Sequence, residues 1–261
     1  MTGHYRSPER LLADLGIMEP ADIDLDAIAF DCGALVVRDT LRGCEARLLG
    51  AGSQAFITVN AAANPRRQRF SIGHELGHWM HDRGAASFRC TKRDFIRNWD
   101  QVSPEQRANR YGADLLLPKS MFLPRARQRP MTLATASDLA DLFVTSLTST
   151  AIRLIENGSF PAMVVLVGPN GIRWRKRGPD VPPQIWLRER PTSDSVAFDL
   201  LRGGTAPGPT DVSAGAWIEG ADRFVICEDS RRVTDEDVLT ILWWKDEAQL
   251  LDADSSIADA E

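Results

Sequence analysis

The first part of the chain alternates between segments with helical and with strand periodicity. In "SPERLLADLGI" (7–17), apolar residues at helical spacing follow a serine and a proline, which are typical of a helix start. Apolar runs on both sides of a Gly/Ser turn predict a β-hairpin, with strands near 46–49 and 56–60. The stretch 69–82 has apolar positions at helical spacing and leaves few polar residues to face water, so it predicts a buried helix.

Residues typical of helix starts and ends predict further helices later in the chain. Segment 103–118 begins with Ser-Pro-Glu-Gln, which supplies an N-cap serine, a proline at the first helical position and the glutamine of a capping box. A proline closes this segment. Segment 131–158 contains two short helical patterns separated by a break near 144–146, and its spacing resembles a helix-turn-helix.

After residue 159 the pattern changes to short strand-like runs separated by Gly and Pro turns. We therefore predict an α+β fold with a first domain over 1–125, a helical segment over 126–159 and an α+β domain over 160–250. The tail over 251–261 is acidic and is expected to be disordered. Four tryptophans are expected in the core of the C-terminal domain: Trp186, Trp217, Trp243 and Trp244.

Composition narrows the class of protein. Hydrophobic residues make up 43% of the 261 positions and charged residues 26%, as in an ordinary soluble globular protein. The net charge of −5 argues against nucleic acid as a partner. No signal peptide or membrane segment is visible, and the four cysteines are scattered, so we expect a cytoplasmic protein without membrane contact.

Candidate chemistry concentrates in one motif, "HELGHWMH", which holds three of the four histidines. Residues four apart lie on one face of a helix, so His74 and His78 can direct two imidazoles at one metal ion. Glu75 can then reach a water molecule on that ion and act as the general base. The alternatives are a chance match or a pair of structural histidines, but Glu75 would then be buried without a partner, at a high cost.

A catalytic zinc site needs a third protein ligand. The best candidate is Glu105, the only glutamate between Glu75 and residue 156, in the first turn of helix 103–118. Its plainer interpretation is a charge that complements a helix N-terminus. Asn109, one turn later, is placed to hydrogen-bond a liganding histidine. The rival ligands are His81, Asp82, Asp94, Asp100 and Asp114.

Two blocks of the sequence resemble the ImmA/IrrE family of bacterial and phage zinc metallopeptidases. Members typically show a strand ending in VN, an arginine-rich turn, RF-x-x-x-HELGH and later E-x-x-A-N-x-[FY]-A-A-x-LL-x-P. This chain carries "AFITVN", "NPRRQRFSIGHELGHWMH" and "SPEQRANRYGADLLLP". The resemblance covers about residues 25–125. It implies a zincin-like domain that binds one Zn²⁺ through His74, His78 and Glu105, with Glu75 as the catalytic base.

The chain departs from the family pattern at two positions. Gly112 stands where members usually have alanine. Arg107 stands where many members have a second glutamate, so a ligand would be missing if that second position held the metal.

The resemblance also implies a function. Family members of this type cleave a helix-turn-helix transcriptional repressor and so induce a stress or mobile-element response. We therefore expect a zinc-dependent endopeptidase of narrow specificity, whose substrate is a repressor and whose C-terminal domain binds a regulatory ligand or partner. A substrate peptide could pair with the edge of strand 56–60, and Tyr111 is a candidate for stabilising the oxyanion.

The alternative is a non-proteolytic DNA- or protein-binding transcriptional regulator in which the metal site is structural or vestigial. The helix-turn-helix-like segment has one cation, Arg153, in its second helix, which favours packing over DNA binding. The basic stretch 173–178 is more typical of a sheet edge protected by charge than of a nucleic-acid site. Cys90 is a candidate inhibitory thiolate for the metal, although a small core residue is the commoner role.

Overall fold

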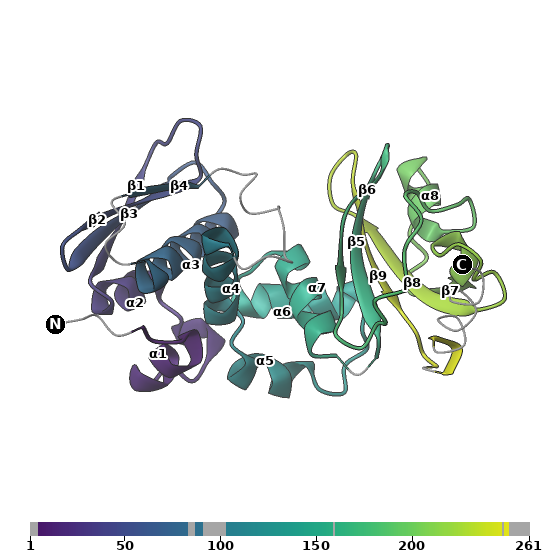
Figure 1. Ribbon diagram of the computed structural model, residues 1–261, viewed down its shortest axis with the longest axis horizontal. Coiled ribbons are helices and arrows are strands. Elements are labelled where there is room, and N and C mark those ends of the chain that lie inside the picture. The colour runs from purple at the N-terminus through teal and green to yellow at the C-terminus, as the bar shows by residue number, and fades with distance from the viewer. Residues whose placement is uncertain (1–4, 83–86, 91–102, 159, 247, 251–261) are drawn as a thin grey trace. The chain divides into compact units, whose positions relative to one another are not determined.

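The computed structural model describes residues 5–82, 87–90, 103–158, 160–246 and 248–250 (Figure 1). The chain divides into two compact units. The first contains residues 1–125 and 140–146, and the second contains residues 126–139 and 147–261. The acidic tail expected over 251–261 lies outside the described residues.

The first unit is built on a small sheet of four strands, which are β1 (Ala34–Asp39), β2 (Ala46–Ala51), β3 (Gln54–Asn60) and β4 (Ser87–Cys90). The predicted hairpin is confirmed, because β2 and β3 pair antiparallel. The strand order is β1-β3-β2-β4, and β3 pairs parallel to β1 on its other side. The expectation that a substrate peptide pairs with β3 is therefore wrong: β3 is an interior strand and has no open edge.

The helices of the first unit are α1 (Pro8–Asp14), the short 3-10 helix η1 (Pro20–Asp22), α2 (Leu25–Asp31), α3 (Pro65–His81), α4 (Pro104–Leu116) and α5 (Lys119–Ala126). Helix α3 packs against the sheet on one side and against α4 on the other (Figure 1). The inward side chains of the strands, such as Leu48, Ile57 and Val59, are almost completely buried beneath it. This burial fixes α3 as the central helix of the unit.

Local sequence signals position the two central helices. The side chain of Asn64 accepts a hydrogen bond from the backbone N–H of Arg67 and so caps the start of α3. At the start of α4 the predicted capping box is confirmed, since Ser103 and Gln106 each bond the other's backbone N–H. These caps determine where each helix begins, and with it which side chains occupy its first turns.

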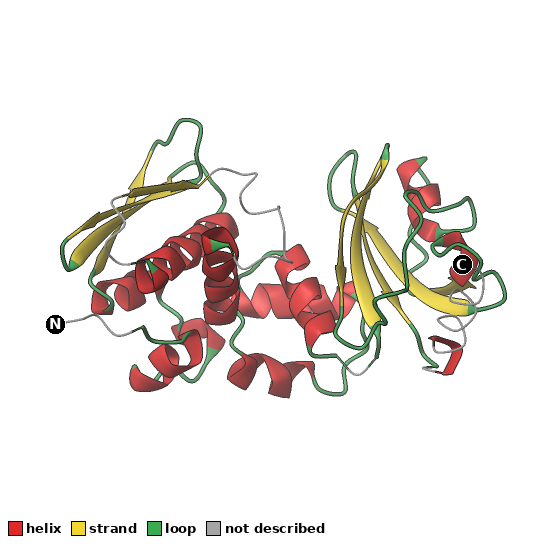
Figure 2. Ribbon diagram, viewed as in Figure 1, coloured by secondary structure: helices red, strands yellow, loops and turns green. Residues whose placement is uncertain are grey.

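The second unit holds an antiparallel sheet of five strands, in the order β6-β5-β9-β8-β7 (Figure 2). They are β5 (Ala162–Gly168), β6 (Gly171–Arg177), β7 (Thr210–Ser213), β8 (Val225–Arg232) and β9 (Val238–Trp243). Its helices are α7 (Leu147–Glu156), α8 (Val196–Leu201) and the 3-10 helix η2 (Ala214–Ala216), while α6 (Leu133–Phe143) is divided between the two units. The basic stretch forms β6, an edge strand, as its charge pattern indicates.

Three of the four tryptophans expected in the core of this unit are buried there, namely Trp217, Trp243 and Trp244. The expectation for Trp186 is wrong, because its side chain is 60% exposed. The guanidinium groups of Arg175 and Arg177 lie 5.2 and 5.5 Å from its ring, so cation–π contacts hold this residue at the surface.

Among the described residues, no helix combines the length and the hydropathy that crossing a bilayer would require.

Candidate metal centre

Two histidines of α3 and one glutamate of α4 meet inside the first unit. The Nε2 atoms of His74 and His78 lie 3.1 Å apart, and both side chains are fully buried. Glu105 places Oε2 3.3 Å from Nε2 of His74 and Oε1 3.3 Å from Nε2 of His78. Ligands of a tetrahedral zinc ion, at bonds of about 2.0–2.2 Å, are separated by about 3.3–3.6 Å. The two distances to Glu105 lie at the lower end of this range and the distance between the imidazoles is slightly below it, so the three residues come close to the spacing that such an ion requires.

Small residues bring α3 and α4 close enough for this meeting. A Cβ atom added at Gly77 would lie 2.8 Å from Cα of Ala108, so the two backbones are in direct contact there. A Cβ atom at Gly112 would lie 2.9 Å from the backbone nitrogen of His74. The glycine that replaces the family's usual alanine at position 112 thus permits the close approach seen in this chain.

The hydrogen bond between His74 and Asn109 defines which nitrogen of the imidazole faces the cluster. Nδ1 of His74 lies 2.9 Å from Oδ1 of Asn109, the contact predicted from the one-turn spacing after Glu105. Because an amide oxygen only accepts, Nδ1 carries the hydrogen and the lone pair of Nε2 faces Glu105. Burial lowers the pKa of His74 and so favours this neutral form. A lone pair facing a carboxylate is unfavourable unless a cation lies between them.

Glu105 stays ionised at this position. Burial would raise the pKa of Glu105, but the adjacent imidazoles of His74 and His78 lower it to about 2, and a cation held between the three side chains would act in the same direction. The cluster therefore combines two imidazole nitrogens with one anionic oxygen, which is the donor set that suits Zn²⁺. Among the described residues, it is the one group of histidine, cysteine, aspartate and glutamate side chains that could hold a metal ion.

Glu75 follows His74 directly on α3 and is fully buried. Its position, one residue around the helix from a candidate ligand, is the one from which a carboxylate can serve a metal-activated water.

Two of the rival ligands lie apart from the cluster. The ring of His81 lies 4.7 Å from that of Tyr5 and 5.9 Å from that of Tyr111, so it packs among aromatic residues. Asp114 pairs with Arg110 at 3.0 Å. Asp94 and Asp100 lie outside the described residues.

The remaining rival, Asp82, faces the opposite nitrogen of a candidate ligand. Its Oδ2 lies 3.7 Å from Nδ1 of His78, on the far side of that ring from Glu105. Arg107 donates to the other oxygen of Asp82 at 2.9 Å and so points at Asp82. Position 105, and not position 107, therefore faces the two histidines. Sequence reasoning missed this pair, although the departure from the family pattern at position 107 was the signal that could have revealed it.

The structure gives Tyr111 a different contact from the one expected. Its hydroxyl donates a hydrogen bond to the backbone oxygen of Arg6 at 3.2 Å, and its ring is buried. This bond ties α4 to the N-terminal segment, so it supports a structural role and not an oxyanion role. The side chain of Cys90, the candidate inhibitory thiolate, lies outside the described residues.

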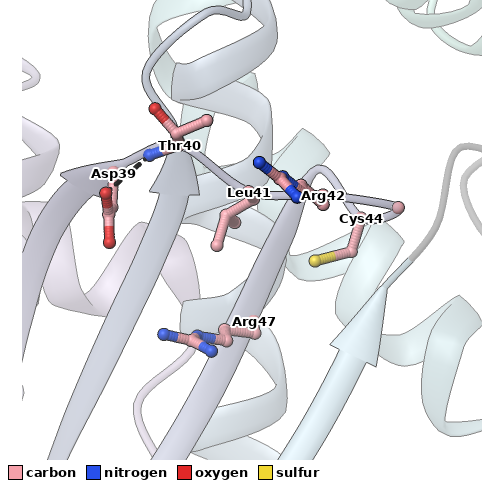
Figure 3. Close-up of a pocket in the computed structure, with 7 residues that line it drawn as sticks. Asp39, Thr40, Leu41, Arg42, Cys44 and Arg47 are labelled. Carbon is pink, nitrogen blue, oxygen red and sulfur yellow. Dashed lines mark hydrogen bonds between the residues drawn. The ribbon is translucent and has the colours of Figure 1, made fainter.

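A separate cavity of about 520 Å³ lies at the loop that joins β1 and β2 (Figure 3). It is lined by Asp39, Thr40, Leu41, Arg42, Gly43, Cys44 and Arg47. None of the three clustered donors lines this cavity, and its two arginines would disfavour a cation. The metal centre is therefore recognised by its three donor side chains, and this cavity is not part of it.

The α+β fold of the first unit and its buried HExxH helix define a zincin-like domain. Residues 35–154 match the family model of the IrrE N-terminal-like domain, Peptidase_M78. This part of the chain is therefore similar to that family, and it contains His74, Glu75, His78 and Glu105.

A solved structure, described as a Mycobacterium tuberculosis transcriptional regulator, is similar to this chain with a TM-score of 0.57 and 17% sequence identity. The similarity covers 90% of this chain and 85% of that one. At this identity the likeness establishes the fold and not a shared activity. A comparison with curated proteins found no match.

Proposed function

We propose that this protein is a zinc-dependent endopeptidase of narrow specificity. The observation that carries the proposal is the mutual spacing of 3.1–3.3 Å among His74, His78 and Glu105, with Glu75 next to the first of them. The match of residues 35–154 to the model of a peptidase family supports it. One zinc ion is the proposed cofactor.

Each residue of the site would have a separate role in peptide hydrolysis. A bound zinc ion would polarise the substrate carbonyl and lower the pKa of a water molecule. Glu75 accepts the proton of the attacking water and passes it to the leaving amine. Burial favours the neutral form of His74, and the Asn109 contact places its hydrogen on Nδ1, so the lone pair of Nε2 remains available to the metal. Burial of both histidines and Glu75 keeps bulk water from competing with these contacts.

A transcriptional repressor of the helix-turn-helix kind is the proposed substrate, as the family resemblance implies. Its cleavage would induce a stress or mobile-element response, and the second unit would bind a regulatory ligand or partner. We place this reaction in the cytoplasm, because the four cysteines are scattered along the sequence with no CxxC pair, which fits a reducing compartment.

A second candidate is a non-proteolytic transcriptional regulator with a structural or vestigial metal site. The solved structure that resembles this chain is described as a transcriptional regulator, which favours this alternative. The helix pair α6–α7 gives little support to DNA binding by such a regulator. The only cation of α7, Arg153, is 2% exposed and cannot reach a phosphate from the surface.

The discriminating variant is Glu75→Gln, which removes the base and keeps the metal ligands. The zinc-loaded wild type and the variant are each incubated with a proteome from the source cells, and new protein N-termini are identified by mass spectrometry. We expect a small set of N-termini with the wild type, none with the variant, and equal zinc content in both. Equal N-termini in the two samples would contradict the proposal, and retention of gene regulation by the variant would favour the alternative.

A further inference from the structure

The pair formed by Asp82 and Arg107 connects the end of α3 to α4 beside the metal centre. Oδ2 of Asp82 is buried and lies 3.7 Å from Nδ1 of His78. Oδ1 of the same carboxylate accepts a hydrogen bond of 2.9 Å from a terminal nitrogen of Arg107. The carboxylate thus has one oxygen on an arginine and the other directed at the imidazole.

This arrangement parallels the one at the other histidine. Oδ1 of Asn109 lies 2.9 Å from Nδ1 of His74, at hydrogen-bond distance, and Oδ2 of Asp82 lies 3.7 Å from Nδ1 of His78, which is within ion-pair distance but too long for a hydrogen bond. In both cases the nitrogen concerned is the one that does not face Glu105. Oxygen acceptors behind metal-bound histidines fix the tautomer and the ring orientation, and they raise the basicity of the liganding nitrogen.

Helix stability alone does not account for an aspartate at this position. Asp82 is the C-cap residue of α3, where the partial charge of the helix end is negative and a carboxylate is unfavourable. Its neighbours that compensate for this charge are Arg107 and the imidazole of His78. The placement is therefore explained by what the carboxylate does for these two groups.

We propose that Asp82 and Arg107 are positioning residues for His78. Once a cation lies between Nε2 and Glu105, the anionic oxygen of Asp82 favours a hydrogen on Nδ1, because a lone pair on that nitrogen would face a negative charge. The lone pair of Nε2 then points at Glu105 and the metal position. Arg107 acts through Asp82 by holding the orientation of its carboxylate. This inference rests on the proposed metal site but does not depend on peptidase activity.

The test measures zinc affinity of the full chain by competition with a chromophoric chelator. We expect Asp82→Ala to weaken zinc binding by about 10- to 100-fold, the usual cost of losing such a partner. Arg107→Gln should lose less, and Arg107→Lys should recover part of that loss, because the lysine keeps the charge on Asp82. The double variant Asp82→Ala/Arg107→Gln should bind zinc no more weakly than Asp82→Ala alone, since Arg107 acts through Asp82.

The matched control is the ion pair between Arg110 and Asp114, which lies on the same helix at 3.0 Å. Arg110→Gln and Asp114→Asn should each leave zinc affinity within about twofold of the wild type, because surface pairs contribute little. A drop as large as that of Asp82→Ala would show a general effect of ion pairs and would overturn the proposal.

A second readout reports on the tautomer itself. In the zinc-loaded protein, long-range ¹H–¹⁵N correlation spectra should show the hydrogen of His78 on Nδ1 in the wild type, and this hydrogen should exchange faster with solvent in Asp82→Ala, where its carboxylate neighbour is lost. Asp82→Asn keeps an acceptor and the side-chain shape, so it is the variant least expected to disturb folding. We expect it to lose zinc affinity by several-fold. Unchanged affinity together with unchanged exchange of the Nδ1 hydrogen in folded variants would refute the positioning role. Cleavage that is unspecific, or that does not require Glu75, would instead contradict the proposed function.

Discussion

The contact between α3 and α4 at Gly77 provides a quantitative prediction. In Gly77→Ala the new Cβ atom would lie 2.8 Å from Cα of Ala108, 2.9 Å from its backbone oxygen and 2.9 Å from Cβ of Tyr111. Ordinary van der Waals contact begins at 3.4 Å, so the helices must separate by about 0.6 Å (3.4 − 2.8). No change of rotamer can relieve the clash, because the nearest atoms belong to the backbone.

Two opposing terms decide the effect on stability. Overpacking of this kind costs about 1–3 kcal/mol. Alanine in place of glycine inside a helix stabilises by about 0.5–1 kcal/mol. The net loss of unfolding free energy should be about 1–2 kcal/mol. Because metal sites tolerate deviations of only about 0.2 Å in their bonds, a separation of about 0.6 Å should also weaken zinc binding by about tenfold or more.

Gly73→Ala on the same helix is the matched control. Its new Cβ atom would lie 3.2 Å from Cα of Gly112, so a displacement of about 0.2 Å (3.4 − 3.2) suffices. The gain in helix propensity should then offset the strain and leave stability within about 0.5 kcal/mol of the wild type.

The assay is urea unfolding of the zinc-free proteins, followed by chelator competition for the zinc affinity. Two results would refute the close-packing account: Gly77→Ala that is as stable and binds zinc as tightly as the wild type, or Gly73→Ala that is the more damaging of the two.

Two further predictions concern single side chains. Asn109→Ala removes the acceptor on Nδ1 of His74, so zinc affinity should fall by about 10-fold or more in chelator competition; Asn109→Asp keeps the acceptor, and an equal loss in both variants would contradict its role. Burial raises the pKa of Glu228 in the second unit, so its proton is held more tightly in the folded than in the unfolded state. The contribution of Glu228 to stability should therefore be greatest below its unfolded pKa and fall as pH rises through its folded pKa. In melting-temperature profiles Glu228→Gln should remove this slope, and an unchanged slope would count against the assignment.

Local signals made much of the first unit predictable from sequence. The spacing of His74 and His78 and the capping box at Ser103 depend on neighbours within one or two turns, and the structure contains both. The strand pair β2–β3 was predictable for the same reason, because a short turn joins them.

Features that depend on distant segments were not predictable in this way. The parallel pairing of β1 with β3 is set by how the chain returns to the sheet, and it makes β3 an interior strand. The four-residue strand β4 is too short to produce a pattern. The surface position of Trp186 depends on two arginines of β6, a contact that no local rule anticipates.

At the metal centre, residue types were predictable but their partners were not. The sequence favoured Glu105 by elimination among few glutamates and by resemblance, while the distances to both imidazoles come from the packing of α3 on α4. The partnership of Asp82 with Arg107 joins residues 25 positions apart and is visible only in the fold.

The central claim is that two imidazoles and one carboxylate hold a single divalent ion. The most direct test is diffraction from crystals grown with zinc, recorded on both sides of the zinc absorption edge. The account predicts one strong anomalous peak within about 2.0–2.2 Å of Nε2 of His74, Nε2 of His78 and a carboxylate oxygen of Glu105. A peak coordinated by other side chains, or fully occupied zinc with Glu105 turned away from it, would contradict the account.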